Sequence, residues 1–129
     1  MNTFCICCSI EQHFVYLCMM ERIMYKTPAF DSFYDSLNVR AKKKVDYIFE
    51  HIRTEKNVST KFVKSLVNTD FYEMRISVDN EYRIVLFAID NDNFINANEI
   101  VLLNGFIKKS TGDYDKQIAI AQKLMEDFL

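Results

Sequence analysis

The stretch FYEMRISVDNEYRIVLFAI at residues 71–89, followed by NEIVLLNGFI at residues 98–107, decides the fold that we predict. Both segments are rich in β-branched and aromatic residues, and apolar side chains recur with a period of two, which is typical of strands. We expect three strands, over Phe71–Val78, Tyr82–Ile89 and Asn98–Ile107. The turn signal Asp79-Asn80 and the polar run at residues 90–93 make the connections short, so the three strands should form an antiparallel meander.

The segments on either side of these strands have helical periodicity. A short strand at Glu21–Lys26 leads into Thr27 and Pro28, which suit the N-cap and the first turn of a helix. Asn38 should end that helix, and a second helix should follow over about 39–55. A last helix, capped by Asp113, should bury one stripe: Ile118, Ala121, Leu124, Met125 and Phe128. The predicted class is α+β, with an N-terminal strand and a helical hairpin packed on a small antiparallel sheet and a C-terminal helix.

The first nineteen residues differ from the rest of the chain. They contain all four cysteines, at positions 5, 7, 8 and 18, and no Lys or Arg. They lack the basic start of a signal peptide, and the Cys-x-Cys-Cys spacing lacks the paired C-x-x-C of structural zinc sites. We therefore expect no metal or cofactor. We expect residues 1–19 to be a dispensable extension or a mis-called gene start, and residues 20–129 to form one domain.

Charge gives a mixed indication of function. The net charge of −2 argues against a nucleic-acid-binding protein, yet Arg40 to Arg83 contains ten Lys or Arg against seven Asp or Glu. Phosphate binding needs only a local basic patch, although such cations more often form a solvated face. No apolar run approaches the roughly 18 residues that span a membrane, so we expect a cytoplasmic protein. His51 lies off the apolar stripe of its predicted helix and should be solvated.

Four segments then occur in a recognisable order: KFVKSL at 61–66, FYEMRI at 71–76, EYRIVLF at 81–87 and IVLLNGFIKK at 100–109. Together they resemble the phage-derived, HigB-like branch of the RelE/HigB/ParE toxin superfamily, and the resemblance covers residues 21–129. It implies the RelE-like fold and metal-independent endonuclease cleavage of mRNA on the ribosome. It also implies an antitoxin partner from the adjacent gene, often with a helix-turn-helix.

The resemblance also implies site residues. Arg75 and Arg83 match the arginines of the two central strands, Lys108 and Lys109 match the lysine pair after the last strand, and Lys61 and Lys64 match basic positions before the sheet. Asn104 stands where this branch commonly has histidine. Because an amide cannot transfer a proton at neutral pH, the general base, and activity itself, stay open.

These residue types suit RNA cleavage by attack of the 2′-hydroxyl on the adjacent phosphate. Arg83, Arg75, Lys108 and Lys64 are the predicted catalytic residues, with Arg83 as the phosphate clamp, because a guanidinium is always charged and binds bidentately. Neighbouring cations favour a neutral lysine, so Lys64 or Lys61 could act as the base. Lys61, Lys109, Tyr82 and Asn104 are the predicted RNA-binding residues, and Tyr82 could stack on a base. Phe106 could also stack, although core packing explains it better.

Two other functions fit the same fold. A ParE-like toxin would inhibit DNA gyrase without cutting RNA. A catalytically decayed toxin would only bind its antitoxin, as the acidic composition and Asn104 would allow.

Overall fold

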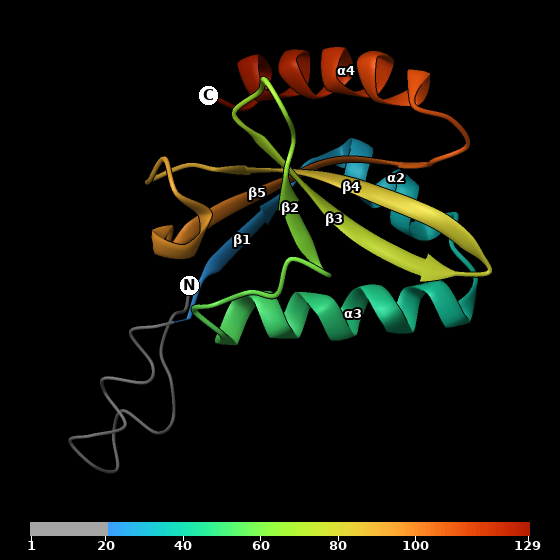
Figure 1. The fold of residues 1–129 in the computed structure, drawn as a ribbon, viewed down its shortest axis with the longest axis horizontal. Coiled ribbons are helices and arrows are strands. Elements are labelled where there is room, and N and C mark those ends of the chain that lie inside the picture. Colours follow the sequence, from blue (N-terminus) through green and yellow to red (C-terminus); the bar gives the residue numbers. More distant parts are fainter. Residues whose placement is uncertain (1–20) are drawn as a thin grey trace, which may run out of the picture.

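A five-stranded sheet organises residues 21–129, the part of the chain that the computed structural model describes (Figure 1). The strands are β1 (Ile23–Lys26), β2 (Val63–Ser65), β3 (Phe71–Val78), β4 (Asn80–Ala88) and β5 (Glu99–Ile107). They lie in the order β1-β5-β4-β3-β2, and β1 is parallel to β5 while the other neighbours are antiparallel. The predicted meander is thus confirmed as the centre of a larger sheet, to which β1 and the unpredicted β2 add the two edges.

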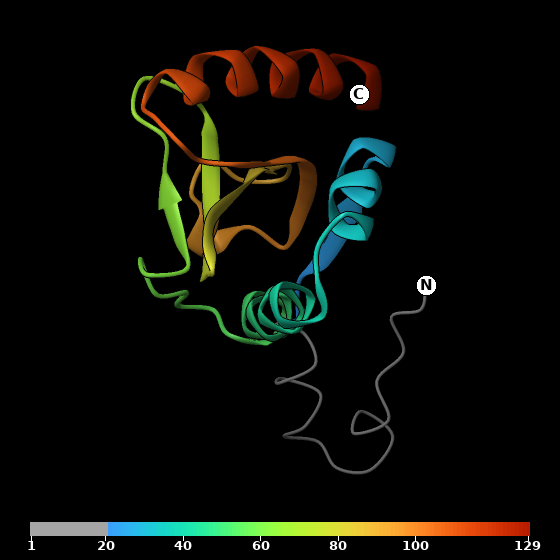
Figure 2. The ribbon, with the colours of Figure 1, turned by 90° about the vertical axis from the view of Figure 1, so that its right-hand side faces the viewer.

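Within residues 21–129, three helices lie on the two faces of this sheet (Figures 1 and 2). α2 (Pro28–Asp35) and α3 (Val39–Thr54) cover one face, and α4 (Gly112–Phe128) covers the other; a short 3-10 turn, η2, spans Phe94–Asn96. The Thr27 side chain accepts a hydrogen bond from the Phe30 amide at 3.2 Å. The Asn38 side chain accepts one from the Ala41 amide at 2.9 Å. The predicted helical hairpin and the Thr27 cap are confirmed, and Asn38, which was predicted only to end the first helix, is also the N-cap of α3.

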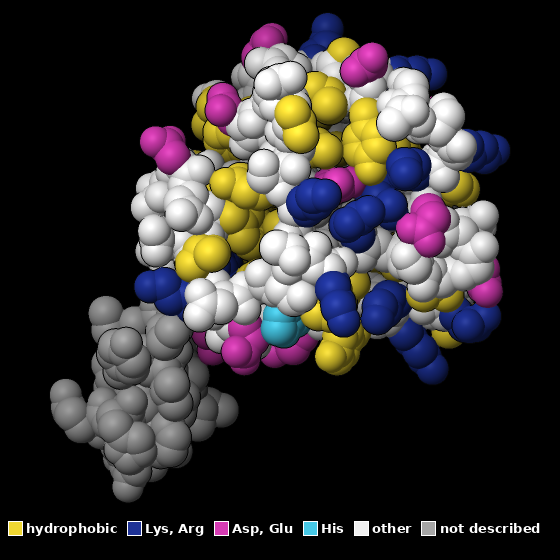
Figure 3. Space-filling model, in the orientation of Figure 1, with side chains coloured by type: hydrophobic (Ala, Val, Ile, Leu, Met, Phe, Trp, Pro, Cys, Tyr) yellow, Lys and Arg dark blue, Asp and Glu magenta, His cyan; other side chains and the backbone are white. Residues whose placement is uncertain are grey.

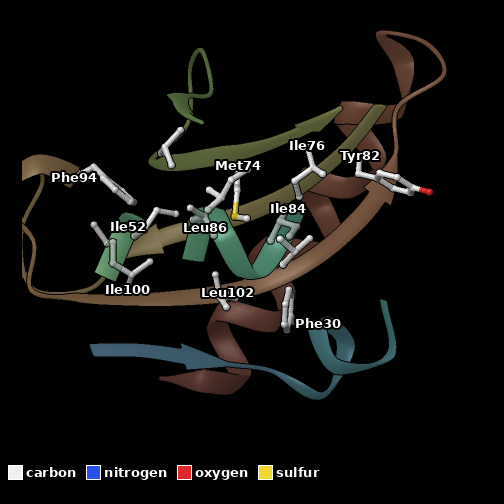
Figure 4. Packing of buried hydrophobic residues seen from close by; sticks show 14 of the residues in the cluster. Phe30, Ile52, Met74, Ile76, Tyr82, Ile84, Leu86, Phe94, Ile100 and Leu102 are labelled. Atoms are coloured by element: carbon white, nitrogen blue, oxygen red, sulfur yellow. The ribbon is translucent and has the colours of Figure 1, made fainter. Parts of the chain in front are cut away.

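Each face of the sheet has its own apolar core. The α3-side core lies between the sheet and α2 and α3, and it includes Ile48, Met74, Ile84 and Leu86, all fully buried (Figure 4). The α4-side core is smaller: Leu66, Phe71, Val85, Val101, Leu103, Phe106, Ala121 and Met125. Two separate cores are expected when helices pack on both faces of a sheet.

One buried cation fixes the start of the domain. Arg22 is 4% exposed, and its guanidinium donates hydrogen bonds to six main-chain carbonyl oxygens. These carbonyls belong to Ile52, Glu55, Lys56, Phe94, Ile95 and Ala97. Arg22 therefore joins the first strand to the end of α3 and to η2.

Three local predictions were wrong. Asp113 is not the N-cap of α4, which is Thr111; instead its carboxylate accepts hydrogen bonds from the amides of Lys109 and Ser110, at 2.7 and 2.9 Å. Phe128 is 39% exposed, because it lies at the end of α4, where its ring packs against Tyr25 of β1 with centroids 5.8 Å apart.

His51 is the third correction. Its ring packs against Phe62 with centroids 5.2 Å apart, and its Nε2 atom is buried.

Among residues 21–129 no helix is long and apolar enough to cross a membrane. The predictions for residues 1–19, including all four cysteines, lie outside the described residues.

Candidate active site

The two arginines of the central strands lie side by side. Arg75 of β3 and Arg83 of β4 are direct partners in the antiparallel register. Directly opposed residues point to the same face of a sheet, and here it is the face that α4 covers, because Phe106, the β5 partner of Arg83, belongs to the α4-side core. The sequence alone did not settle whether the two arginines share a face, because a slip of one residue in the register would have put them on opposite faces.

Arg83 is enclosed by two carboxylates and a tyrosine hydroxyl, which come from β3, β4 and α4. Its Nε donates to the Tyr114 hydroxyl at 3.1 Å and lies 3.2 Å from a carboxylate oxygen of Glu73. Its Nη1 donates to Glu81 at 3.1 Å and to the Tyr82 carbonyl at 2.9 Å. The Tyr114 hydroxyl in turn donates to Glu73 at 2.6 Å. We call Arg83, Glu73, Glu81 and Tyr114 the Arg83 cluster.

The surroundings shift the pKa values of Tyr114 and Glu81 in this cluster. Burial raises the pKa of Tyr114, and its hydrogen bond to Glu73 raises the pKa further, while the bond from Arg83 lowers it. Hydrogen bonds from Ser77 and from Arg83 lower the pKa of Glu81, so this carboxylate stays ionised. At neutral pH the cluster therefore holds an ionised Glu81 and a protonated Tyr114 hydroxyl on either side of the guanidinium.

Arg83 is buried, which its predicted role as a phosphate clamp did not lead us to expect. Its side chain is only 3% exposed, whereas the prediction of a phosphate clamp assumed an open guanidinium. Sequence reasoning also missed Glu73 and Tyr114. Tyr114 lies 31 residues from Arg83 in the chain, and only the packing of α4 on the sheet brings the two together.

Other predicted cations surround this cluster. Lys64 of β2 pairs with Glu73 of β3 in the register, so its exposed side chain lies on the same face. Arg75 is half-buried, and its side chain makes no hydrogen bond or ion pair within residues 21–129. The Lys108 amide donates to the Glu81 carbonyl at 2.7 Å, which places Lys108 beside the cluster. Four of the predicted catalytic residues, Arg83, Arg75, Lys108 and Lys64, thus share one region.

Lys61 and Lys109 are both exposed, directly before β2 and after β5. Figure 3 shows that Lys and Arg side chains gather on the face that includes β2 and β3. The acidic net charge of the chain therefore conceals a local basic surface. Within the described residues, no group of His, Cys, Asp and Glu has the arrangement of a metal site.

Two predicted RNA-binding residues lie elsewhere than expected. Tyr82 points to the α3-side core, is 6% exposed, and packs edge-on against Phe33, so it cannot stack on RNA at the Arg83 cluster. Asn104 is on the correct face but is buried under α4, where its Nδ2 donates to Gln117 Oε1 at 2.9 Å. Its Oδ1 is buried without a hydrogen-bond partner in the described part of the chain. Phe106 packs edge-on against Tyr114 and is likewise buried.

Comparison with known families identifies the chain. Residues 32–126 match the family model for the phage-derived protein Gp49-like (DUF891). The chain belongs to this Gp49-like family. The match covers most of the sequence and confirms the predicted phage-derived branch. No curated protein sequence matches this Gp49-like chain.

Solved structures support the fold of this Gp49-like chain. It is similar to a chain of the intact Escherichia coli RelBE toxin–antitoxin complex, with a TM-score of 0.53 and 10% identity, covering 69% of this chain and 99% of the other. A free mutant of the E. coli toxin RelE gives 0.55 and 10%, covering 78% and 97%. The RelB–RelE antitoxin–toxin complex of Methanococcus jannaschii gives 0.50 and 21%, covering 70% and 96%. The predicted RelE-like fold is therefore confirmed.

Proposed function

We propose that this Gp49-like protein is the toxin of a type II toxin–antitoxin system and cleaves mRNA on the ribosome, in the cytoplasm. The observation that carries the proposal is the meeting of unpaired cations, Arg75 and Lys64, with the buried Arg83 cluster on one face of the sheet. RelE chains of the same fold occur in toxin–antitoxin complexes, which supports an antitoxin as the partner.

The chemistry needs no metal. The 2′-oxygen of a ribose forms a bond to the adjacent phosphorus, the bond from phosphorus to the 5′-oxygen breaks, and a proton moves from the first oxygen to a base and from an acid to the second. Arg75, Lys64 and Lys108 would bind the phosphate and stabilise the charge of the pentavalent state. Lys61 and Lys109 would bind the flanking phosphates.

Proton transfer falls to the Arg83 cluster or to Lys64. Asn104 cannot carry a proton at neutral pH, and Glu73 and Tyr114 are joined by a 2.6 Å hydrogen bond beside the cations. Arg83 would supply fixed positive charge under the phosphate and hold Glu73 and Tyr114 in place. Asn104 would position α4 through Gln117 rather than contact RNA.

Induced expression tests the proposal, with and without the adjacent gene. Growth should stop without that gene, and primer extension should find cuts in translated messages but none in untranslated ones. Arg83→Ala should relieve the arrest while the folded protein still binds its antitoxin. Asn104→His should raise activity if position 104 can serve in proton transfer. Intact messages with altered DNA supercoiling during arrest would favour the gyrase-directed alternative.

Two observations favour a second candidate, the decayed toxin. Arg83 is held by two carboxylates, and Asn104 is bound to Gln117 where the family branch commonly has a histidine. Absence of any growth arrest, together with tight antitoxin binding, would support this alternative.

A further inference from the structure

The N-terminal half of α3 carries cations that neither core uses. Lys43 is exposed and Lys44 is half-buried, and neither forms an ion pair within the described residues. With Arg40, Tyr47 and Val78 they line an open hollow at the end of the sheet. We call these five residues the α3 surface. It lies on the opposite face of the sheet from the Arg83 cluster, since α3 and α4 cover different faces (Figure 2).

An exposed aromatic side chain lies among these cations. Tyr47 is 61% exposed, which is unusual for so large a ring in a helix that has a well-formed apolar face. The Lys44 ammonium lies 5.5 Å from the centroid of the Tyr47 ring and 5.6 Å from that of Phe62. The two rings meet edge-on with centroids 6.2 Å apart. Phe62 therefore supports the Tyr47 ring from one side, and most of the Tyr47 residue stays open to solvent.

Nearby acidic groups neutralise Arg40 of this surface but do not pair with its two lysines. Asp79 forms an ion pair with Arg40 at 2.8 Å, and Asp46 accepts a hydrogen bond from the Tyr34 hydroxyl at 2.9 Å. Lys43 and Lys44 are left to attract an anion from solution. Side chains with free positive charge beside an exposed aromatic ring are the combination that binds single-stranded nucleic acid, through phosphates and base stacking.

The α3 surface is also continuous with the candidate active site around the β2 edge. The Arg75 amide donates to the Phe62 carbonyl at 2.8 Å, so the ring that supports Tyr47 belongs to the residue next to Arg75 across the strands. Lys61 precedes Phe62, and Lys64 follows it on the face of the Arg83 cluster. Figure 3 shows Lys and Arg side chains both at the β2–β3 side of the sheet and over α3.

We propose that the α3 surface is a second binding site for single-stranded RNA, which holds phosphates through Lys43 and Lys44 and stacks one base on Tyr47. The inference deepens the proposed function and rests on its RNA substrate. The bound strand passes round the β2 edge to the Arg83 cluster. This surface adds affinity and takes no part in the chemistry. The RNA is the message, because the strand held here is the one that reaches the Arg83 cluster.

The test measures RNA binding by the full chain. Fluorescence anisotropy with a labelled oligouridine, over a range of salt, compares wild type with Lys43→Ala/Lys44→Ala, Tyr47→Ala and Tyr47→Phe. The double lysine variant should lower the slope of log K against log salt by about 1.4, because each phosphate contact to a single strand contributes about 0.7. Tyr47→Ala should weaken binding about 5- to 150-fold, and Tyr47→Phe should bind as wild type does.

The matched control is Lys56→Ala/Lys123→Ala, which removes the same charge from exposed positions away from this surface. It should leave binding at the wild-type level, and thermal melting should find every variant folded. A second arm uses isolated small ribosomal subunits. A loss in the oligouridine arm supports the inference. A loss only in the subunit arm would mean that the surface binds ribosomal RNA, and it would overturn the inference.

The inference and the proposed function fail in different ways. If the protein cuts no message but the α3-surface variants lose RNA binding, the proposed function is wrong and the inference stands. If these variants bind RNA as wild type does in both arms, the inference is overturned even when cleavage is normal. It is also overturned if they lose only antitoxin binding, since the surface would then bind protein.

Discussion

The two buried arginines of this protein show how one residue type serves two purposes. Arg22 and Arg83 are 4% and 2% exposed. Arg22 is surrounded by six main-chain carbonyls, which cannot move without unfolding the segments that carry them. Arg83 is surrounded mainly by side chains, those of Glu73, Glu81 and Tyr114, which can change rotamer or protonation. The first arrangement stabilises a fold, and the second can take part in chemistry.

The comparison predicts the largest stability loss at Arg22. Arg22→Ala leaves several buried carbonyl oxygens without a donor, and each such group costs about 1–3 kcal/mol. Because water will reach some of them, we expect the free energy of unfolding to fall by about 3–5 kcal/mol. Urea denaturation measures this loss. A change below about 1 kcal/mol would mean that these carbonyls are already hydrated.

A pair of tyrosine variants tests whether the side chains around Arg83 take part in cleavage. Tyr114→Phe removes the hydroxyl that joins Glu73 to Arg83, and we expect message cleavage to slow about 100-fold, a typical contribution of a proton-transfer group. Tyr82→Phe, on the opposite face, should leave the cleavage rate unchanged. The rates are measured in a reconstituted translation reaction. Equal cleavage rates for the two variants would mean that the Tyr114 hydroxyl takes no part in the reaction.

The end of α4 should contribute less to the stability of the domain than the sequence indicated. Removal of residues 127–129 deletes Phe128, which is partly exposed and contacts Tyr25, so we expect a loss of about 1 kcal/mol, less than full burial of a phenylalanine would give. Met125→Ala, in the α4-side core, should cost about 2–5 kcal/mol. Chemical denaturation compares the two, and the reverse order would show that the terminus stabilises the domain more than the core of α4 does.

The smallest effect concerns pH. The folded state lowers the pKa of Glu81, through Ser77 and Arg83. Its contribution to stability is therefore present above the unfolded pKa and is lost as pH falls through the folded pKa. Glu81 is half-exposed, so this contribution should be only a few tenths of a kcal/mol. Glu81→Gln should flatten the stability profile below about pH 4.5, as thermal melting at several pH values would detect; an unchanged profile would contradict this.

The sequence predicts the central elements well because their signals are local. β3 spans Phe71–Val78 as expected, Thr27 caps its helix as expected, and Asn38 lies between the two predicted helices. β2 was missed because its three residues are too few for a periodicity, and its pairing with β3 is tertiary.

The site was predicted less completely because burial depends on distant segments. Arg83 is enclosed by Tyr114 of α4, and Tyr82 points to the opposite core because strand neighbours alternate between faces. Neither fact follows from spacing along the chain. The family resemblance identified the cations but not the carboxylate and the hydroxyl that hold Arg83.

The most direct test of the central claim is the message cleavage rate per folded molecule for Arg22→Ala and Arg83→Ala in reconstituted translation, with the folded fraction taken from thermal melting. Arg83→Ala should reduce the rate about 100- to 1000-fold, the typical cost of losing an electrostatic group at the transition state. Arg22→Ala should keep the wild-type rate per folded molecule despite its lower stability. Equal losses in the two variants, or no loss in Arg83→Ala, would contradict the division of roles between the two buried arginines.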